Sequence, residues 1–173
     1  MTRTDFMLSK IVDRKTAAQR VEMWRLKNDQ VVFSNGCFDI LHKGHVTYLT
    51  QAASEGNRLV LGLNTDASVR RLGKGDDRPI NDEESRAIVL AALSVVDLIV
   101  LFDEDTPEAL ISELKPDVLV KGADYDAEET DSNSPKYIVG SDLVRKYGGS
   151  VVSIPLVEGF STTSTLERMK GKA

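Results

Sequence analysis

His42 and His45 are the only two histidines of the chain, and they stand three residues apart. A short apolar run and a glycine precede them, and apolar residues at helical spacing follow, which predicts a strand, a tight turn and a helix. Residues at i and i+3 share one helical face, so both imidazoles can face a single ligand. The unpaired N–H groups and positive dipole end of a helix start favour anions. This arrangement predicts a phosphate site around Gly44.

Metal binding and covalent catalysis need groups that the sequence does not supply at this position. A zinc site on the histidine pair lacks an obvious third ligand, and the single Cys37 excludes an internal disulfide and a multi-cysteine zinc site. Cys37 lies beside the glycine turn, where phosphate chemistry requires no thiolate. The remaining alternative is structural, with one histidine packed in the core and the other in solvent.

The elements that position the histidines follow a regular alternation. Apolar segments predict five strands, at residues 31–35, 58–64, 97–102, 117–120 and 150–155, with helices between them. This order predicts a Rossmann-like, doubly wound α/β fold with a mostly parallel five-stranded sheet and helices on both faces. Such sheets bind ligands beyond the carboxyl ends of their strands, at the point where strand order reverses. The histidine pair lies there if strand 31–35 is central.

The flanks of this core are predicted from helix signals. Thr16 and Gln19 resemble a capping box that starts a leader helix over about residues 16–27, covering one edge of the sheet. Asn81 is the expected N-cap of a later helix. We expect one domain over residues 1–173, with its core at about 30–170.

Composition excludes several classes of protein. The net charge of -5 argues against a nucleic-acid or anionic-membrane binder, because phosphate-backbone binding requires a basic surface. No apolar run approaches the length of a membrane span, and the N-terminus lacks the apolar core of a signal peptide. A cytoplasmic location is expected. Neither the glycine pattern of dinucleotide-binding domains nor a P-loop is present.

The motif from Asn35 to Asp39 (NGCFD), running into HKGH at residues 42–45, resembles the signature of the cytidylyltransferase-like nucleotidyltransferases. Further similar blocks occur in order at residues 62–70, 78–79, 86–87, 116–125, 138–140 and 158–163, so the resemblance covers about residues 28–170. Within the family, these blocks are similar to members that transfer AMP from ATP to D-glycero-D-manno-heptose 1-phosphate. That resemblance implies synthesis of ADP-heptose, with release of pyrophosphate, for lipopolysaccharide or surface glycans.

The resemblance and the chemistry of the transfer assign roles to individual residues. The expected catalytic residues are His42, His45 and Lys74. The expected nucleotide and phosphate contacts are Asn35, Gly36, Phe38, Asp39, Gly44, Arg70, Ser161, Thr162 and Thr163. The expected contacts to the acceptor substrate are Asn64, Lys121 and Asp124.

The partners expected are ATP and a sugar 1-phosphate, with Mg²⁺ as cofactor, no nucleic acid and no membrane. Mg²⁺ is expected to bind the phosphates, since small hard cations prefer oxygen ligands. Asp39 is the one protein ligand considered, and its alternative is to hold the turn as an Asx-type residue. We also expect a homodimer and a separate heptose 7-phosphate kinase.

Two other functions fit the same motifs. A cytidylyltransferase acting on glycerol 3-phosphate or another alcohol phosphate would use the same histidines and the same Ser-Thr-Thr segment. A nucleotide-binding regulatory module without turnover would need the site but not its full set of basic and hydroxyl groups. The retention of that full set favours an enzyme.

A first prediction concerns Lys74, which lies in a basic, glycine-bearing loop and is expected to clamp the triphosphate in the transition state. Lys74→Ala should lower turnover far more than it weakens binding of the sugar phosphate. Steady-state kinetics at saturating substrates measure this difference. Equal turnover in variant and parent would show that Lys74 is an ordinary solvated charge.

Overall fold

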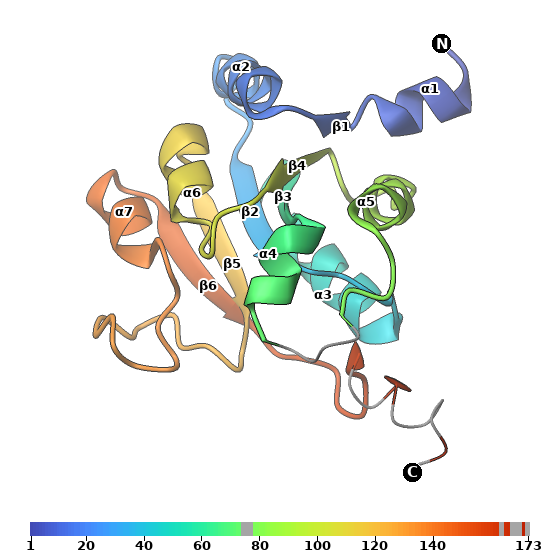
Figure 1. Cartoon of the computed structure of the whole chain (residues 1–173). Helices are drawn as coiled ribbons and strands as arrows, with labels where there is room; N and C mark the ends of the chain where they lie inside the picture. Colours follow the sequence, from blue (N-terminus) through green and yellow to red (C-terminus); the bar gives the residue numbers. More distant parts are fainter. Residues whose placement is uncertain (74–77, 163–164, 167–170, 172–173) are drawn as a thin grey trace.

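The computed structural model describes residues 1–73, 78–162, 165–166 and 171. Its first half contains α1 (Arg3–Leu8), β1 (Ile11–Val12), α2 (Arg14–Arg25), β2 (Val31–Gly36), α3 (Lys43–Ala53), β3 (Arg58–Asn64) and α4 (Asp66–Arg71). The second half contains α5 (Glu83–Ala91), β4 (Leu98–Phe102), α6 (Glu108–Leu114), β5 (Val118–Gly122), α7 (Ser141–Lys146) and β6 (Ser150–Ile154). The described strands form one sheet in the order β1-β4-β3-β2-β5-β6, and all their pairings are parallel (Figure 1).

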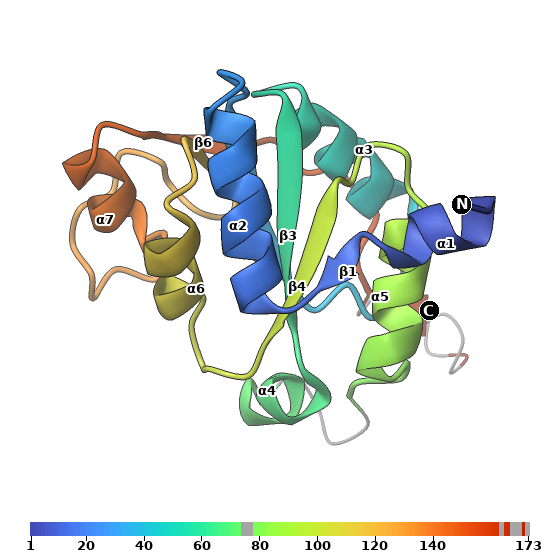
Figure 2. The ribbon, with the colours of Figure 1, turned by 90° about the horizontal axis from the view of Figure 1, so that it is seen from above.

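Helices cover both faces of this sheet, as the alternation of elements predicts. One face packs against α3 and α5, through Leu49 and Leu90 among others. The opposite face packs against α2, α6 and α7, through Val21, Ile111 and Val144. Figure 2 shows α2 lying across the sheet beside α6. Because both faces are buried, the inner strands are apolar along their length rather than alternating.

The strand expected at residues 31–35 is β2, and it lies at the centre of the sheet. Its neighbours are β3 on one side and β5 on the other, so the strand order reverses at this position. The carboxyl end of β2 therefore opens into the crevice where doubly wound sheets bind ligands. The predicted placement of the histidine pair at this crevice is confirmed.

Tyr48 fixes the helix that follows β2. Its buried hydroxyl shares a 2.7 Å hydrogen bond with Ser34 Oγ and donates a 3.1 Å hydrogen bond to the Val120 carbonyl. These contacts join α3 to β2 and β5. They set the position of the helix whose first turn carries the histidines.

The sheet has six strands, and the prediction of five is wrong. The additional strand is β1, in which Ile11 and Val12 pair with Ile99 and Val100 of β4 at the edge of the sheet. Two residues are too few to produce a recognisable apolar pattern. The preceding α1 also went unpredicted, although Thr2 and Asp5 form a complete capping box there.

Two predicted helix caps are displaced. The leader helix expected over 16–27 is α2, and its N-cap is Asp13, whose carboxylate accepts a 2.7 Å hydrogen bond from Thr16 N–H. This helix covers a face of the sheet rather than an edge, because Ala17 and Val21 are fully buried against the strands. Asp82, not Asn81, caps α5 by accepting a 2.7 Å hydrogen bond from Ser85 N–H. Asn81 is thereby free for the contacts described below.

Among the helices in the described part of the chain, none has the length and apolar character needed to cross a membrane.

Candidate active site

The two histidines lie against each other at the entrance of α3. Their rings stack with centroids 3.8 Å apart and planes inclined by 17°. His42 is the N-cap residue, and its Nδ1 accepts a 3.4 Å hydrogen bond from the His45 N–H. That bond leaves Nε2 of the neutral His42 ring as a donor for a ligand. The predicted meeting of both imidazoles on one helix entrance is confirmed.

Both imidazoles are held neutral in the free protein. Burial, followed by the proximity of His42, lowers the pKa of His45 to about 4, while the Ile40 backbone opposes this shift. Burial also lowers the pKa of His42. His45 Nδ1 is buried and, within the described residues, makes no hydrogen bond of regular geometry. The pair therefore presents neutral donors whose proton affinity will rise when an anion binds beside them.

A cleft of about 770 Å³ opens in front of the histidines at the carboxyl end of the sheet. The residues expected at the site that line it are Asn35, Gly36, Phe38, Asp39, His42, Gly44, His45, Asn64, Lys121, Asp124, Ser161 and Thr162. The segment after β6 runs past α3 (Figure 1), and its residues Leu156, Val157 and Phe160 line the cleft. Phe160 on this segment lies with its ring centroid 6.3 Å from that of His42.

Three expected residues are not part of this lining. Lys74 and Thr163 lie outside the described residues. Arg70 is exposed on the last turn of α4 and does not line the cleft. The adjacent Arg71 pairs with Asp105 at 2.8 Å. The described structure thus offers no contact between Arg70 and the histidines.

Two positions of the turn exclude or strain a side chain. A Cβ on Gly44 would lie 3.1 Å from His42 Nδ1 and from Phe160 Cβ, so a side chain there would require these neighbours to shift by a few tenths of an ångström. Phe38 adopts a left-handed backbone conformation with φ of 46°, which is unfavourable for a bulky residue. Its ring meets His45 edge to face at a centroid distance of 5.4 Å. The strained backbone of the turn thereby places the Phe38 ring against His45.

Asp39 holds the turn to a distant loop. Its buried carboxylate accepts 2.9 Å hydrogen bonds from the N–H groups of Ile80 and Asn81. Arg78 Nε lies 2.6 Å from Asp39 Oδ2 as an ion pair whose N–H is not aligned for a hydrogen bond. Asn81 also donates a 2.6 Å hydrogen bond to the Asp39 carbonyl. Of the two roles considered for Asp39, this geometry favours the structural one.

The residues expected to contact the acceptor differ in how much bonding capacity remains. The Asn64 side chain is already hydrogen-bonded within the protein, since its Nδ2 donates a 2.9 Å hydrogen bond to Ser68 Oγ. Lys121 Nζ lies 3.3 Å from the Asn35 carbonyl and 5.5 Å from the Tyr125 ring centroid. Asp124 is exposed at the rim of the cleft. Asn35 Oδ1 is buried without a hydrogen-bond partner in the described part of the chain, so its amide can bind a ligand.

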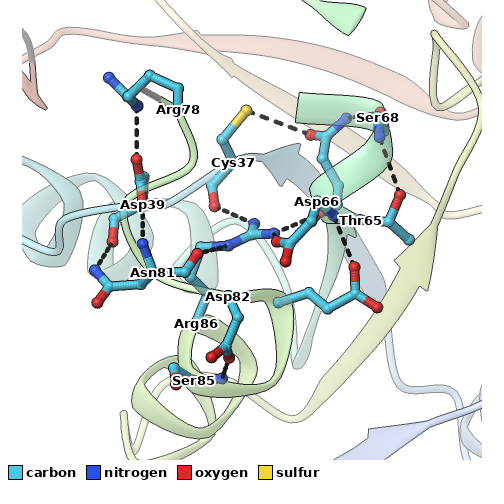
Figure 3. A network of polar contacts seen from close by, with 12 residues as sticks. Cys37, Asp39, Thr65, Asp66, Ser68, Arg78, Asn81, Asp82, Ser85 and Arg86 are labelled. Carbon is cyan, nitrogen blue, oxygen red and sulfur yellow. Dashed lines mark hydrogen bonds and ion pairs between the residues drawn. The ribbon is translucent and has the colours of Figure 1, made fainter. Parts of the chain in front are cut away.

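Arg86 was given no role from the sequence, yet it joins the segments around the cleft (Figure 3). Its fully buried guanidinium donates to the carbonyls of Cys37, Asn64 and Asn81 and to the carboxylate of Asp66. The sequence signal was present, because this arginine shares the inward face of an otherwise amphipathic helix with Ala87 and Leu90.

The side chains of the cleft suit a metal ion whose oxygen ligands come mainly from a bound substrate. No group of three histidine, cysteine or acidic side chains capable of holding a metal occurs among the described residues. Asp39 has its carboxylate occupied by backbone N–H groups and Arg78. The exposed carboxylate of Asp124 is left as a protein oxygen at the rim.

Comparison with known proteins identifies similar sequences and folds. Residues 33–163 match the family model described as cytidylyltransferase-like. The bifunctional protein HldE of Magnetococcus marinus is 52% identical over 163 residues, and that of Caulobacter vibrioides is 55% identical over 160 residues. The alignments cover 94% and 92% of this chain but 32% and 31% of those relatives. The chain therefore spans about a third of the length of these curated relatives.

Solved structures agree with the fold. The lipopolysaccharide core biosynthesis protein from Thermoplasma volcanium is 31% identical, with a TM-score of 0.56, and the match covers 75% of this chain and 97% of that one. A pantoate-beta-alanine ligase from Francisella tularensis has a TM-score of 0.57 at 15% identity, over 92% of this chain and 76% of that one. At that identity the second likeness concerns the fold alone.

A second prediction follows from the depressed pKa of His45. The folded-state pKa lies below the value of about 6.5 expected for an unfolded chain, so the unfolded state takes up its proton first as the pH falls. The stabilising effect of the neutral imidazole is complete above about pH 6.5 and is lost towards pH 4. Urea unfolding at about pH 7.5 and about pH 4.5 should show a smaller acid-induced loss of stability in His45→Gln than in wild type. If the free energy of unfolding fell equally in His45→Gln and in wild type, the lowered pKa of His45 would be contradicted.

Proposed function

Because this chain belongs to the cytidylyltransferase-like family and is a nucleotidyltransferase, we propose that it transfers AMP from ATP to D-glycero-D-manno-heptose 1-phosphate. The products are ADP-heptose and pyrophosphate. One observation carries the proposal: two stacked, neutral histidines stand at a helix entrance inside a cleft at the reversal point of a parallel sheet. That geometry supplies fixed donors where a triphosphate would lie.

The reaction is an in-line displacement at the α-phosphorus of ATP. An oxygen of the sugar phosphate forms the new bond to phosphorus, and the bond to the bridging oxygen of pyrophosphate breaks. The acceptor oxygen is already ionised, so no protein nucleophile or general base is required to activate it. This accords with the position of Cys37, which is buried beside the turn with its Sγ 3.9 Å from Asn64 Oδ1.

The protein contributes orientation and charge stabilisation. Negative charge grows on the leaving and non-bridging oxygens, and donors fixed in a partly dehydrated cleft stabilise that charge without reorganising. His42 and His45 would donate to the α- and β-phosphates beside the N–H groups of the α3 entrance. Ser161 and Thr162 also line the cleft and would contact the β- and γ-phosphates. Loss of one such donor in other enzymes costs about 100-fold to 1000-fold in turnover.

Mg²⁺ would enter with ATP as the magnesium complex, because the phosphates bring the hard oxygen ligands that the described side chains do not gather. When bound, it neutralises charge on the phosphates. The carboxylate of Asp124 at the rim is a candidate outer contact for this complex.

The choice of acceptor rests on the family resemblance together with the polar end of β5. Lys121 and Asp124 line the cleft there, and Tyr125 lies beneath the Lys121 ammonium group. A heptose offers several hydroxyls to such groups, and each polar group left unpaired by a smaller acceptor costs about 1 to 3 kcal/mol. A related solved protein carries the description of lipopolysaccharide core biosynthesis, which is consistent with a heptose substrate. The homodimer and the separate kinase stay predictions, and the curated relatives are themselves bifunctional.

A third prediction tests the substrate pair. Of ATP, CTP, GTP and UTP crossed with heptose 1-phosphate, glycerol 3-phosphate and other sugar phosphates, ATP with heptose 1-phosphate should give the highest kcat/KM in a pyrophosphate-release assay. Activity should require Mg²⁺ and disappear with a chelator. The phosphate contacts are common to all nucleotides, so the base must be selected elsewhere in the cleft. A higher kcat/KM for CTP with glycerol 3-phosphate would overturn the heptose assignment and leave nucleotidyl transfer intact.

A further inference from the structure

Arg86 makes an unusual set of contacts for a residue outside the cleft. Its side chain is fully buried. Nη1 donates to the Cys37 carbonyl at 2.7 Å, and Nη2 donates to the Asn64 carbonyl at 2.8 Å and to Asp66 Oδ1 at 2.8 Å. Nε donates to the Asn81 carbonyl at 3.0 Å. One guanidinium thus joins the turn after β2, the end of β3, the start of α4 and the loop before α5.

Three of the joined segments carry residues of the cleft lining, namely Cys37, Asn64 and Arg78, while Arg86 itself does not line it. Cys37 precedes the strained Phe38, whose ring packs against His45. Asn81 lies in the loop that begins at Arg78, and this loop is bound to Asp39 through backbone N–H groups. Figure 3 shows the Arg86 guanidinium between Asn81 on its left and Asp66 on its right, with Cys37 above it.

This arrangement requires the planar guanidinium group of arginine, whose N–H donors form a fork that reaches several acceptors. Three acceptors are neutral carbonyls in different directions, and the single carboxylate of Asp66 balances the charge. A lysine ammonium has one nitrogen and cannot reach acceptors so widely spaced. A buried guanidinium with one counter-charge is costly to desolvate, so its contribution lies more in fixing geometry than in raising stability.

We propose that Arg86 is a positioning residue for nucleotidyl transfer. It holds the turn at residues 37–39 and the loop at 78–81 in a fixed relative position, so that the histidine pair faces the phosphates. This inference rests on the proposed function. It predicts that loss of the fork changes turnover in protein that is still folded, because a small displacement of donors lowers transition-state stabilisation more than substrate binding.

The main test is Arg86→Lys, which keeps the charge and removes the fork. Turnover with ATP and heptose 1-phosphate should fall about tenfold or more, with each KM changed less than about threefold. The pKa of His45, followed by NMR, should rise from about 4 towards the ordinary histidine value, because a loosened turn admits water. The chain has only two histidines, so their signals can be assigned with His42→Gln.

A second variant covers the case in which Arg86→Lys does not fold. Asp66→Asn removes the counter-charge from a carboxylate that is partly exposed, and turnover should fall in the same direction. Its matched control is Asp97→Asn. Asp97 pairs with Arg58 Nη1 at 3.2 Å and caps Leu59 N–H at the opposite end of β3, so its loss should leave turnover within about twofold.

The outcomes separate this proposal from the proposed function. Wild-type turnover together with an unchanged His45 titration in folded Arg86→Lys would overturn the positioning role, as would equal turnover in Asp66→Asn and Asp97→Asn. If wild-type protein does not use heptose 1-phosphate at all, the function fails. The histidine titration then still tests whether Arg86 fixes the turn, because that measurement needs no substrate.

Discussion

Two buried charges hold the carboxyl edge of the sheet together. The Asp39 carboxylate binds the N–H groups of Ile80 and Asn81, and the Arg86 guanidinium binds the Cys37 and Asn64 carbonyls. Each group is costly to bury and is stable only when its hydrogen bonds are made. The turn after β2, the end of β3 and the loop before α5 therefore stabilise one another through these two groups. These segments form a unit on which the histidine site depends for its walls.

The strand order of the sheet is the second constraint, because it determines where that unit lies. β2 lies between β3 and β5, and the strand order reverses there, so the helix after β2 starts at the mouth of the crevice. Tyr48 ties α3 to both neighbouring strands through Ser34 and Val120. The stacked histidines are consequently carried by a rigid helix start rather than by a free loop. Preorganised donors of this kind stabilise a transition state without a reorganisation cost.

Local sequence patterns predict those features of the fold and the site that depend on residues close together in the chain. The His42 and His45 spacing, the glycine turn and the apolar strands predict the site and the α/β fold. The edge strand at Ile11 and Val12 was missed because two residues carry no period. Arg86 and Asn81 were missed as structural partners of the site because their contacts to Cys37 and Asp39 cross more than 40 residues of chain. No spacing rule reports such a contact, and the position of Asn81 before a helical pattern predicts a helix cap instead.

The stacked histidines are proposed to stabilise the transition state of adenylyl transfer. The most direct measurement is single-turnover pyrophosphate release by His42→Ala and by His45→Ala, at saturating Mg·ATP and heptose 1-phosphate, with folding checked by circular dichroism. Each substitution should lower the rate by about 100-fold or more, because each removes a fixed donor from the developing charge. A near wild-type rate in both folded variants would contradict this role of the histidines.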